Sequence, residues 1–212
     1  MIYVIMCGGE YEEFKKPKQL TFVNGVPNVQ RTIDLLHEND IWNIYISSND
    51  ERFDDFDAPR LEHENTFKVR NGKMEGYWLD AFYPHLPADA EVTFLFGDVV
   101  FTPAAIKRIV HANVKENTLV GNSVAKNRAH RNTGEPFAYI VTDYKAFMDG
   151  VTAVKRAFDE GKLKRHPIVW ELYRYLNRLD LNVQQIIDRT YIAIDDGTID
   201  IDSVEQQRLW EE

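Results

Sequence analysis

Short apolar runs alternate along this chain with amphipathic helical segments, and this alternation is the feature that most constrains the fold. The strand-like runs are residues 2–6, 41–48, 91–101, 118–122 and 135–142. Strands separated by helices usually join into a mostly parallel sheet with helices on both faces. We therefore predict an α/β protein, with residues 1–212 forming a single three-layer α/β/α domain around a mostly parallel mixed sheet.

Helix-start signals fall between these runs. Thr102 precedes Pro103, an N-cap followed by a proline at the first helical position, and predicts a helix to about residue 113. Pro27 is predicted to open a helix, and Asp143 to cap one. Residues 203–206 (Ser-Val-Glu-Gln) form a capping-box pattern that predicts a short terminal helix.

Three further local patterns give predictions that the structure can test. Asn71-Gly72 lies between two short runs and predicts a hairpin turn. Residues 78–85 are predicted to be helical. Pro167 is predicted to start a helix with one apolar face, which consists of Ile168, Leu172, Tyr175 and Leu179.

Charge and composition exclude several classes of protein. The 212 residues carry a formal net charge of −9, which argues against a long nucleic-acid groove, because such grooves are rich in Lys and Arg. Cys7 is the single cysteine, so a disulfide framework and a cysteine zinc site are excluded. No apolar stretch is long enough to span a membrane. We expect a cytoplasmic protein, and a homodimer is one assembly that the sequence allows.

The segment after the first apolar run combines two glycines with three lysines. Gly8 and Gly9 are followed by Lys15, Lys16 and Lys18, but neither of the two common phosphate-loop motifs is present. Glycines let backbone N–H groups approach a phosphate closely, and lysines neutralise its charge. An ordinary strand-to-loop turn with solvated lysines explains the same residues, and composition alone favours that alternative.

The order of the elements in this region changes that balance. Gly8-Gly9, Pro17-Lys18-Gln19-Leu20, Gly25-Val26-Pro27 and the helix that follows resemble the opening of nucleotidyltransferases of glycosyltransferase-A-like fold. These include sugar-1-phosphate nucleotidylyltransferases, cytidylyltransferases and molybdenum-cofactor guanylyltransferase-type enzymes. The resemblance implies a nucleotide-diphospho-sugar transferase-like fold and a catalytic Lys18. It also implies nucleotide binding by Cys7, Gly8, Gly9, Lys15, Lys16 and Lys18.

One departure from that pattern concerns the loop itself. Related loops usually carry an arginine that holds the triphosphate, whereas residues 10–13 here read Glu-Tyr-Glu-Glu. Acidic side chains would repel a triphosphate unless they point away or help to hold a metal. Lys15 or Lys16 could replace the arginine, but only as point charges without its bidentate fork.

Two acidic positions are candidate metal ligands. Asp98 follows a buried apolar run, which places it at the carboxyl edge of the sheet, where ligand sites of α/β proteins form. The resemblance implies that Asp98 is a catalytic Mg²⁺ ligand and that Asp202, or alternatively Asp200, is the second ligand. A turn aspartate and acidic residues at a helix N-terminus are the alternative interpretations.

The sequence signals for residues that bind the acceptor are weaker than those for the nucleotide. Arg128 and Arg131 belong to a basic segment of an otherwise acidic protein and could bind the phosphate of an acceptor, with a solvated loop as the alternative. Glu135 opens a predicted strand that could line the same pocket.

These residues predict a Mg²⁺-dependent nucleotidyltransferase. It would join a nucleoside triphosphate to a phosphorylated sugar or alcohol and release pyrophosphate, without a nucleic-acid or membrane partner. Two alternatives stay open. A glycosyltransferase of the same fold would use a nucleotide-sugar, but its usual Asp-x-Asp is absent at Asp98. A catalytically weakened nucleotide or sugar-phosphate binding module would explain the acidic loop.

Overall fold

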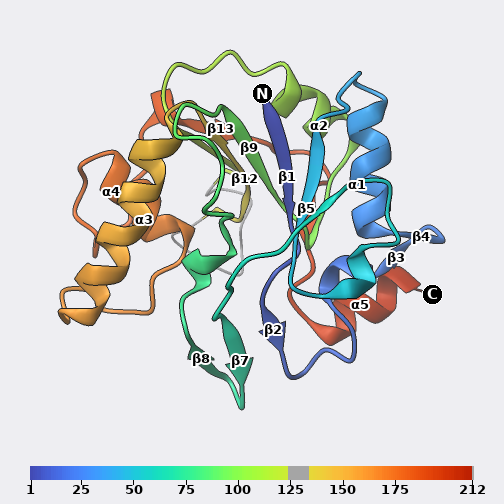
Figure 1. Ribbon diagram of the computed structural model, residues 1–212, viewed down its shortest axis with the longest axis horizontal. Coiled ribbons are helices and arrows are strands. Elements are labelled where there is room, and N and C mark those ends of the chain that lie inside the picture. Colours follow the sequence, from blue (N-terminus) through green and yellow to red (C-terminus); the bar gives the residue numbers. More distant parts are fainter. Residues whose placement is uncertain (124–133, 212) are drawn as a thin grey trace.

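The computed structural model describes residues 1–123 and 134–211, which are arranged around a seven-stranded sheet (Figure 1). Across the sheet the strands are β13 (Tyr191–Ala193), β11 (Thr118–Gly121), β12 (Pro136–Val141), β9 (Val92–Phe96), β1 (Ile2–Met6), β5 (Ile44–Ser47) and β6 (Arg60–Leu61). Only the pairings of β12, with β9 and with β11, are antiparallel. The prediction of a mostly parallel mixed sheet is confirmed.

The central strands end at a common edge. Met6 at the end of β1 pairs with Ser47 of β5 and with Phe96 of β9. Because these three strands are parallel, the residues that follow them emerge side by side at the carboxyl edge of the sheet. Strands β1 and β9 are apolar on both faces, as expected for strands buried between two layers of helices.

Helices lie on both sides of the sheet. Figure 1 shows α3 (Tyr144–Asp159) and α4 (Val169–Leu176) packed together on the left and α1 (Asn28–His37) on the right. The helix α2 (Pro103–Val110) packs against α1, and α5 (Val204–Glu211) closes the chain against β3 (Phe22–Val23). This is the predicted three-layer arrangement. Within residues 1–123 and 134–211, no helix combines the length and the apolar character needed to cross a bilayer.

Most of the predicted helix caps are present. The Thr102 side chain accepts a hydrogen bond from the Ala105 N–H, and Asp143 accepts one from the Ala146 N–H. Each bond satisfies a backbone donor that has no partner inside its helix. Pro27 is itself the N-cap of α1, one residue before the helix begins.

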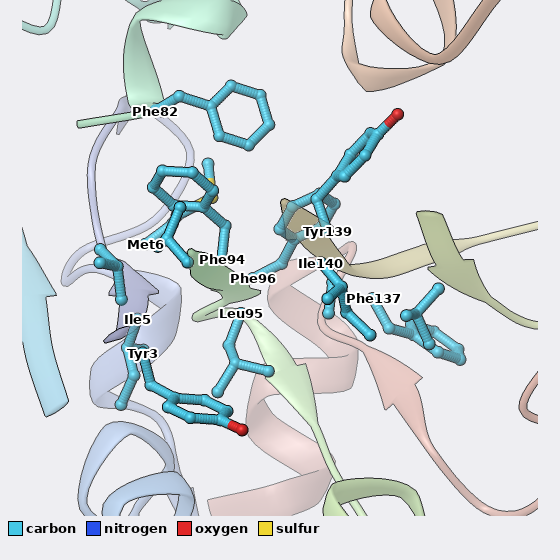
Figure 2. Close-up of a cluster of buried hydrophobic side chains, with 14 of the residues drawn as sticks. Tyr3, Ile5, Met6, Phe82, Phe94, Leu95, Phe96, Phe137, Tyr139 and Ile140 are labelled. Carbon is cyan, nitrogen blue, oxygen red and sulfur yellow. The ribbon is translucent and has the colours of Figure 1, made fainter. Parts of the chain in front are cut away.

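An aromatic cluster fills the space between the sheet and α3. The ring of Phe94 stacks on Phe147 at 5.8 Å and meets the edge of Phe82 at 5.0 Å. Tyr139 of the neighbouring strand meets Phe147 at 5.0 Å. Figure 2 shows Leu95 pointing away from Phe94, as the alternation of side chains along a strand requires. Burial of each of these rings contributes roughly 1.5–3 kcal/mol.

Several small strands lie near the edge where β1, β5 and β9 end. They form a three-stranded sheet and two strand pairs, and four short 3₁₀ turns are also found in the described residues. The strands are β2 (Glu10–Tyr11), β7 (Lys68–Arg70) and β8 (Lys73–Glu75) in one sheet, with β3 paired to β4 (Val26–Pro27) and β10 (Val99–Val100) to β14 (Ile199–Asp200). The turns are η1 (Lys18–Leu20), η2 (Glu51–Phe53), η3 (Trp78–Ala81) and η4 (Asp188–Thr190).

The hairpin prediction is confirmed, and one helix prediction is wrong. Asn71 and Gly72 connect β7 to β8 with φ angles of 49° and 71°, the positive values that a tight two-residue hairpin turn requires. The predicted helix over residues 78–85 is only the single turn η3. The turn ends at Phe82, whose ψ of 121° is extended, and Pro84 further disfavours a helical conformation at the residue before it.

The prediction of the apolar face of the helix after Pro167 is only partly correct. Leu172 is fully buried, but Tyr175 is 42% exposed and Leu179 lies beyond the end of α4. The helix ends early because Arg178 adopts a left-handed conformation with φ of 56°. The predicted extension of α2 to residue 113 also fails, since that helix ends at Val110.

Replacement of Gly97 tests how tightly the carboxyl edge is packed. A Cβ atom at this position would lie 2.5 Å from the Met6 carbonyl oxygen and 2.9 Å from the Cys7 sulfur. Because the backbone contact cannot relax, Gly97→Ala should destabilise the protein by about 1–3 kcal/mol in urea unfolding. Gly197→Ala is the control, since the nearest neighbour of a Cβ atom there would be the Thr102 methyl at 3.7 Å. Equal stability of the two variants would contradict this packing.

Candidate functional site

A cavity of about 870 Å³ opens at the carboxyl edge of the sheet. Its volume is in the range of pockets that bind small molecules and cofactors. The wall consists of residues 7–12, 14–19, 48–52, 65, 67, 69 and 70. All of the residues predicted to bind nucleotide line it: Cys7, Gly8, Gly9, Lys15, Lys16 and Lys18. The structure therefore brings them together around one space.

The two glycines let the loop after β1 pass close to its neighbours. A Cβ on Gly8 would lie 2.1 Å from the Asn65 side-chain nitrogen, and Gly9 has a φ of 90°. Cys7 donates its backbone N–H to the Ser47 carbonyl at 2.8 Å. Burial raises the pKa of the Cys7 thiol well above its usual value, and the nearby Asp98 raises that pKa further. The thiol therefore stays protonated and fills space beside the glycines.

Lys18 is buried at the inner end of this loop. Only 6% of its surface is exposed, and its ammonium lies 3.6 Å from an Asp98 carboxylate oxygen. The ammonium also lies 4.5 Å from the centre of the Tyr11 ring and 5.0 Å from that of Phe14. A buried ammonium needs such partners, because transfer of an unpaired charge out of water is strongly unfavourable. Pro17 precedes the turn η1 and directs Lys18 inward.

Asp98 is held in place by the chain on either side of it. The Asn28 side chain donates to the carbonyls of Gly97 and Val99, at 3.0 and 2.9 Å. The Ile201 N–H donates to the Asp98 carbonyl at 3.0 Å, next to the antiparallel pair of β10 and β14. This pairing carries the C-terminal segment to the end of β9, more than 90 residues earlier in the sequence.

Three other carboxylates meet beside this pair of strands. One oxygen each from Glu135, Asp200 and Asp202 lies within 4.8 Å of the others. The pKa of Asp200 is raised to about 9, first by burial and then by the negative charges of Asp202, Glu135 and Asp98. Carboxylate oxygens are the ligands that Mg²⁺ and Mn²⁺ prefer. This group of residues can therefore hold a divalent cation.

The carboxylate cluster differs in part from the sequence prediction. Asp202 and its alternative Asp200 lie together, and Asp98 is near enough to raise the pKa of Asp200. The three-residue cluster, however, contains Glu135, which the sequence assigned to the acceptor side. Glu135 immediately precedes β12, and because β12 runs antiparallel to β9, its first residues lie at the edge where β9 ends. The local sequence pattern did not show this strand direction.

The remaining predicted residues have different outcomes. Lys16 forms an ion pair with Glu211 of α5 at 2.5 Å, while Lys15 is exposed on the cavity wall. Arg128 and Arg131 lie outside the residues that the structure describes. Arg52 and Arg70 also line the cavity, although the sequence patterns did not indicate either of them.

Comparisons with known proteins agree with this geometry. The sequence profile of the family described as the MobA-like NTP transferase domain matches residues 3–181. No curated protein matches the chain.

Several solved structures share the fold. CTP:phosphocholine cytidylyltransferase from Streptococcus pneumoniae is 15% identical, with a TM-score of 0.56 and coverage of 99% of this chain and 97% of that one. 4-Diphosphocytidyl-2C-methyl-D-erythritol synthase from Anaerococcus prevotii is 10% identical, with a TM-score of 0.56 and coverage of 99% of this chain and 96% of that one. Rv0371c from Mycobacterium tuberculosis, in complex with manganese, is 12% identical, with a TM-score of 0.52 and coverage of 99% of this chain and 98% of that one. At these identities the similarity shows the fold alone.

The raised pKa of Asp200 predicts an unusual dependence of stability on pH. Between the ordinary pKa of 3.8 and the folded value of about 9, the folded state binds the proton more strongly than the unfolded state. Stability from this group is therefore fully present below pH 4 and is lost as the pH rises toward 9. In buffer with EDTA, the midpoint temperature of thermal unfolding of the wild type should fall over this range relative to that of Asp200→Asn.

The control for this measurement is Asp149→Asn, which removes an exposed carboxylate on α3. It should follow the pH profile of the wild type. If the profiles of wild type and Asp200→Asn run parallel from pH 5 to pH 8.5, the carboxylates do not interact as described.

Proposed function

The chain belongs to the MobA-like NTP transferase domain family, and from this premise we propose that it is a Mg²⁺-dependent nucleotidyltransferase. It joins a nucleoside triphosphate to a phosphorylated sugar or alcohol and releases pyrophosphate. The observation that carries the proposal is the contact of the buried Lys18 with the half-buried Asp98, which lies between a cavity of nucleotide size and a carboxylate cluster. Charge of both signs is thus available where a phosphate would react.

The nucleotide occupies the cavity in this proposal. The loop at Gly8 and Gly9 offers backbone N–H groups that no Cβ shields, and Lys15 and Lys16 add positive charge on the wall. Lys18 stabilises the negative charge that develops on the α-phosphate. Its distance of 3.6 Å from Asp98 exceeds a normal hydrogen bond, so the ammonium can turn toward a phosphate oxygen without first breaking a tight contact.

The carboxylate oxygens at the proposed site suit a divalent cation. Asp98 and Asp202 would hold Mg²⁺, with Asp200 beside them. The pKa of Asp200 is raised first by burial and then by neighbouring negative charge, and a cation would neutralise that charge. When bound, Mg²⁺ neutralises charge on the phosphates as pyrophosphate leaves. The manganese complex of a structural neighbour supports the use of a divalent cation at this fold.

No strong general base is needed for this reaction. A phosphate monoester is already ionised at neutral pH, so the protein mainly has to position it and stabilise charge. Consistent with this, no histidine is among the described residues that line the cavity. We assign Glu135, which immediately precedes β12 and belongs to the carboxylate cluster, to the acceptor side.

Further observations support the proposed acceptor class and compartment. The name of the pneumococcal neighbour specifies CTP and phosphocholine, which supports a phosphorylated alcohol as one acceptor class. We place the reaction in the cytoplasm, in keeping with a sequence whose single cysteine offers no internal disulfide. A net charge of −9 argues against a nucleic-acid partner.

Two substitutions of matched size test the catalytic assignment. Lys18→Met keeps the packing between Tyr11 and Phe14 but removes the charge, and Asp98→Asn removes the carboxylate charge without a change of volume. Each should lower the rate of pyrophosphate release by about 10²–10³-fold. The assay would pair each of the four common triphosphates with phosphorylated sugars and alcohols. Asp149→Asn should keep the full rate, and loss of less than threefold in both site variants would contradict the mechanism.

Ligand-induced shifts of the unfolding midpoint identify the donor. One triphosphate with Mg²⁺ should raise the midpoint as its concentration rises, and the shift should shrink in EDTA. Stabilisation by a nucleotide-sugar but by no triphosphate would instead favour a glycosyltransferase. Triphosphate binding without pyrophosphate release from any acceptor would favour a binding module.

A further inference from the structure

The β7–β8 hairpin brings an arginine to the wall of the cavity, and we propose that Arg70 binds the outer phosphates of the triphosphate through its guanidinium group. The identification of the ligand as a triphosphate rests on the proposed function. Arg70 lies more than 50 residues after the glycine loop and belongs to none of the motifs in that loop. The structure nevertheless places it on the same wall as Gly9 and Lys15.

The hairpin is built onto the loop after β1. In the parallel pair of β2 and β7, Glu10 faces Lys68 and Tyr11 faces Val69. The Glu10 N–H donates to the Phe67 carbonyl at 3.1 Å, and the Glu12 N–H donates to the Val69 carbonyl at 3.0 Å. The hairpin and the loop therefore form one sheet (Figure 1), and Arg70 is fixed relative to the glycines.

Ring packing makes this attachment rigid. The Tyr11 ring meets the edge of Phe67 at 5.7 Å and that of Phe14 at 6.1 Å. Gly76, with a φ of 66°, lies so close to the Thr66 carbonyl that a Cβ would be 2.2 Å from its oxygen. The hairpin is thus held at its base as well as along β2.

The hairpin also neutralises the acidic loop. Glu10 lies 3.0 Å from the Lys68 ammonium and 3.7 Å from the Arg70 guanidinium, and Glu12 accepts the Asn71 N–H at 2.8 Å. These contacts direct both carboxylates toward the hairpin. Because Lys68 is the closer partner of Glu10, it can keep that carboxylate neutralised while Arg70 turns to a phosphate.

Most other cations on the described cavity wall are already engaged. Arg52 is bound through two nitrogens to Asp50, with distances of 2.9 and 2.5 Å, and its hydrogen bonds lower the pKa of Asp50 despite partial burial. Lys16 is paired with Glu211 at 2.5 Å, and the buried Lys18, assigned above to the α-phosphate, is not available to the outer phosphates.

Arg70 is held less tightly by its partner than Arg52 and Lys16 are by theirs, and its guanidinium group suits a phosphate better than an ammonium group does. Its contact with Glu10 is a single nitrogen at 3.7 Å, beyond hydrogen-bond distance, and its side chain is 53% exposed. Its planar fork matches two phosphate oxygens at once, whereas the exposed Lys15 can offer only a point charge. Arg70 is therefore the guanidinium best placed to bind the ligand.

Inorganic tripolyphosphate tests this assignment without the nucleotide. Its affinity would be measured by titration calorimetry with Mg²⁺ in fixed excess, for wild type, Arg70→Ala, Arg70→Lys and Lys73→Ala. Lys73 pairs with Arg70 across the hairpin, is exposed and does not line the cavity, so it controls for the loss of one positive charge. Arg70→Ala should bind at least about tenfold more weakly, Arg70→Lys should be intermediate, and Lys73→Ala should change by less than about threefold.

Several outcomes would overturn the assignment. These are no measurable binding to wild type, equal losses in Arg70→Ala and Lys73→Ala, or full affinity in Arg70→Ala. If Arg70→Ala lowers the ligand-free unfolding midpoint, Arg70→Gln repeats the measurement with the length of the side chain kept.

Pyrophosphate release separates this inference from the proposed function. Arg70-dependent binding of tripolyphosphate by a protein that releases no pyrophosphate would leave the phosphate site standing and refute the transferase. Full pyrophosphate release by Arg70→Ala at low triphosphate concentration would refute the role of Arg70 and leave the transferase standing.

Discussion

The contact between Lys18 and Asp98 is the interaction on which the arrangement of this edge depends. Lys18 is almost completely buried, and without the carboxylate its charge would lack an ionic partner among the residues that the structure describes. The pair ties the loop after β1 to the end of β9, two neighbouring strands whose ends the sheet already aligns. The pair is therefore both a structural constraint and a source of opposite charges at one point.

The C-terminal segment completes this arrangement. Strand β14 pairs with β10 directly after Asp98, and α5 then packs on the loop through a small apolar cluster that contains Phe14, Val100 and Ile201. The Gln207 side chain donates to the Thr21 hydroxyl at 2.8 Å, which joins α5 to the region that follows Lys18. Residues from the two ends of the chain thus fix the same loop, and Asp200 and Asp202 reach the carboxyl edge as part of this closure.

The sequence predicted those features that depend on local patterns. Apolar runs located the main strands, and Thr102 and Asp143 located the starts of two helices. Features that depend on distant pairing were not predictable in this way. The approach of Glu135 to Asp200 follows from the antiparallel direction of β12, and the contact of Glu10 with Lys68 spans 58 residues. The site residues drawn from the family resemblance remain predictions, although the structure brings those that it describes to one edge.

The acidic loop shows why a motif read in isolation can mislead about charge. Residues 10–13 carry three carboxylates, which would repel a triphosphate if they faced the cavity without partners. The hairpin supplies Lys68 and Arg70 to Glu10 and a backbone N–H to Glu12, so much of that repulsion is balanced within the folded protein. Because Lys68 and Arg70 belong to a strand that pairs with β2, both residues stay beside the loop, and Lys68 remains next to Glu10 when Arg70 turns to a phosphate. Electrostatic complementarity at this site therefore belongs to the tertiary structure rather than to the loop sequence.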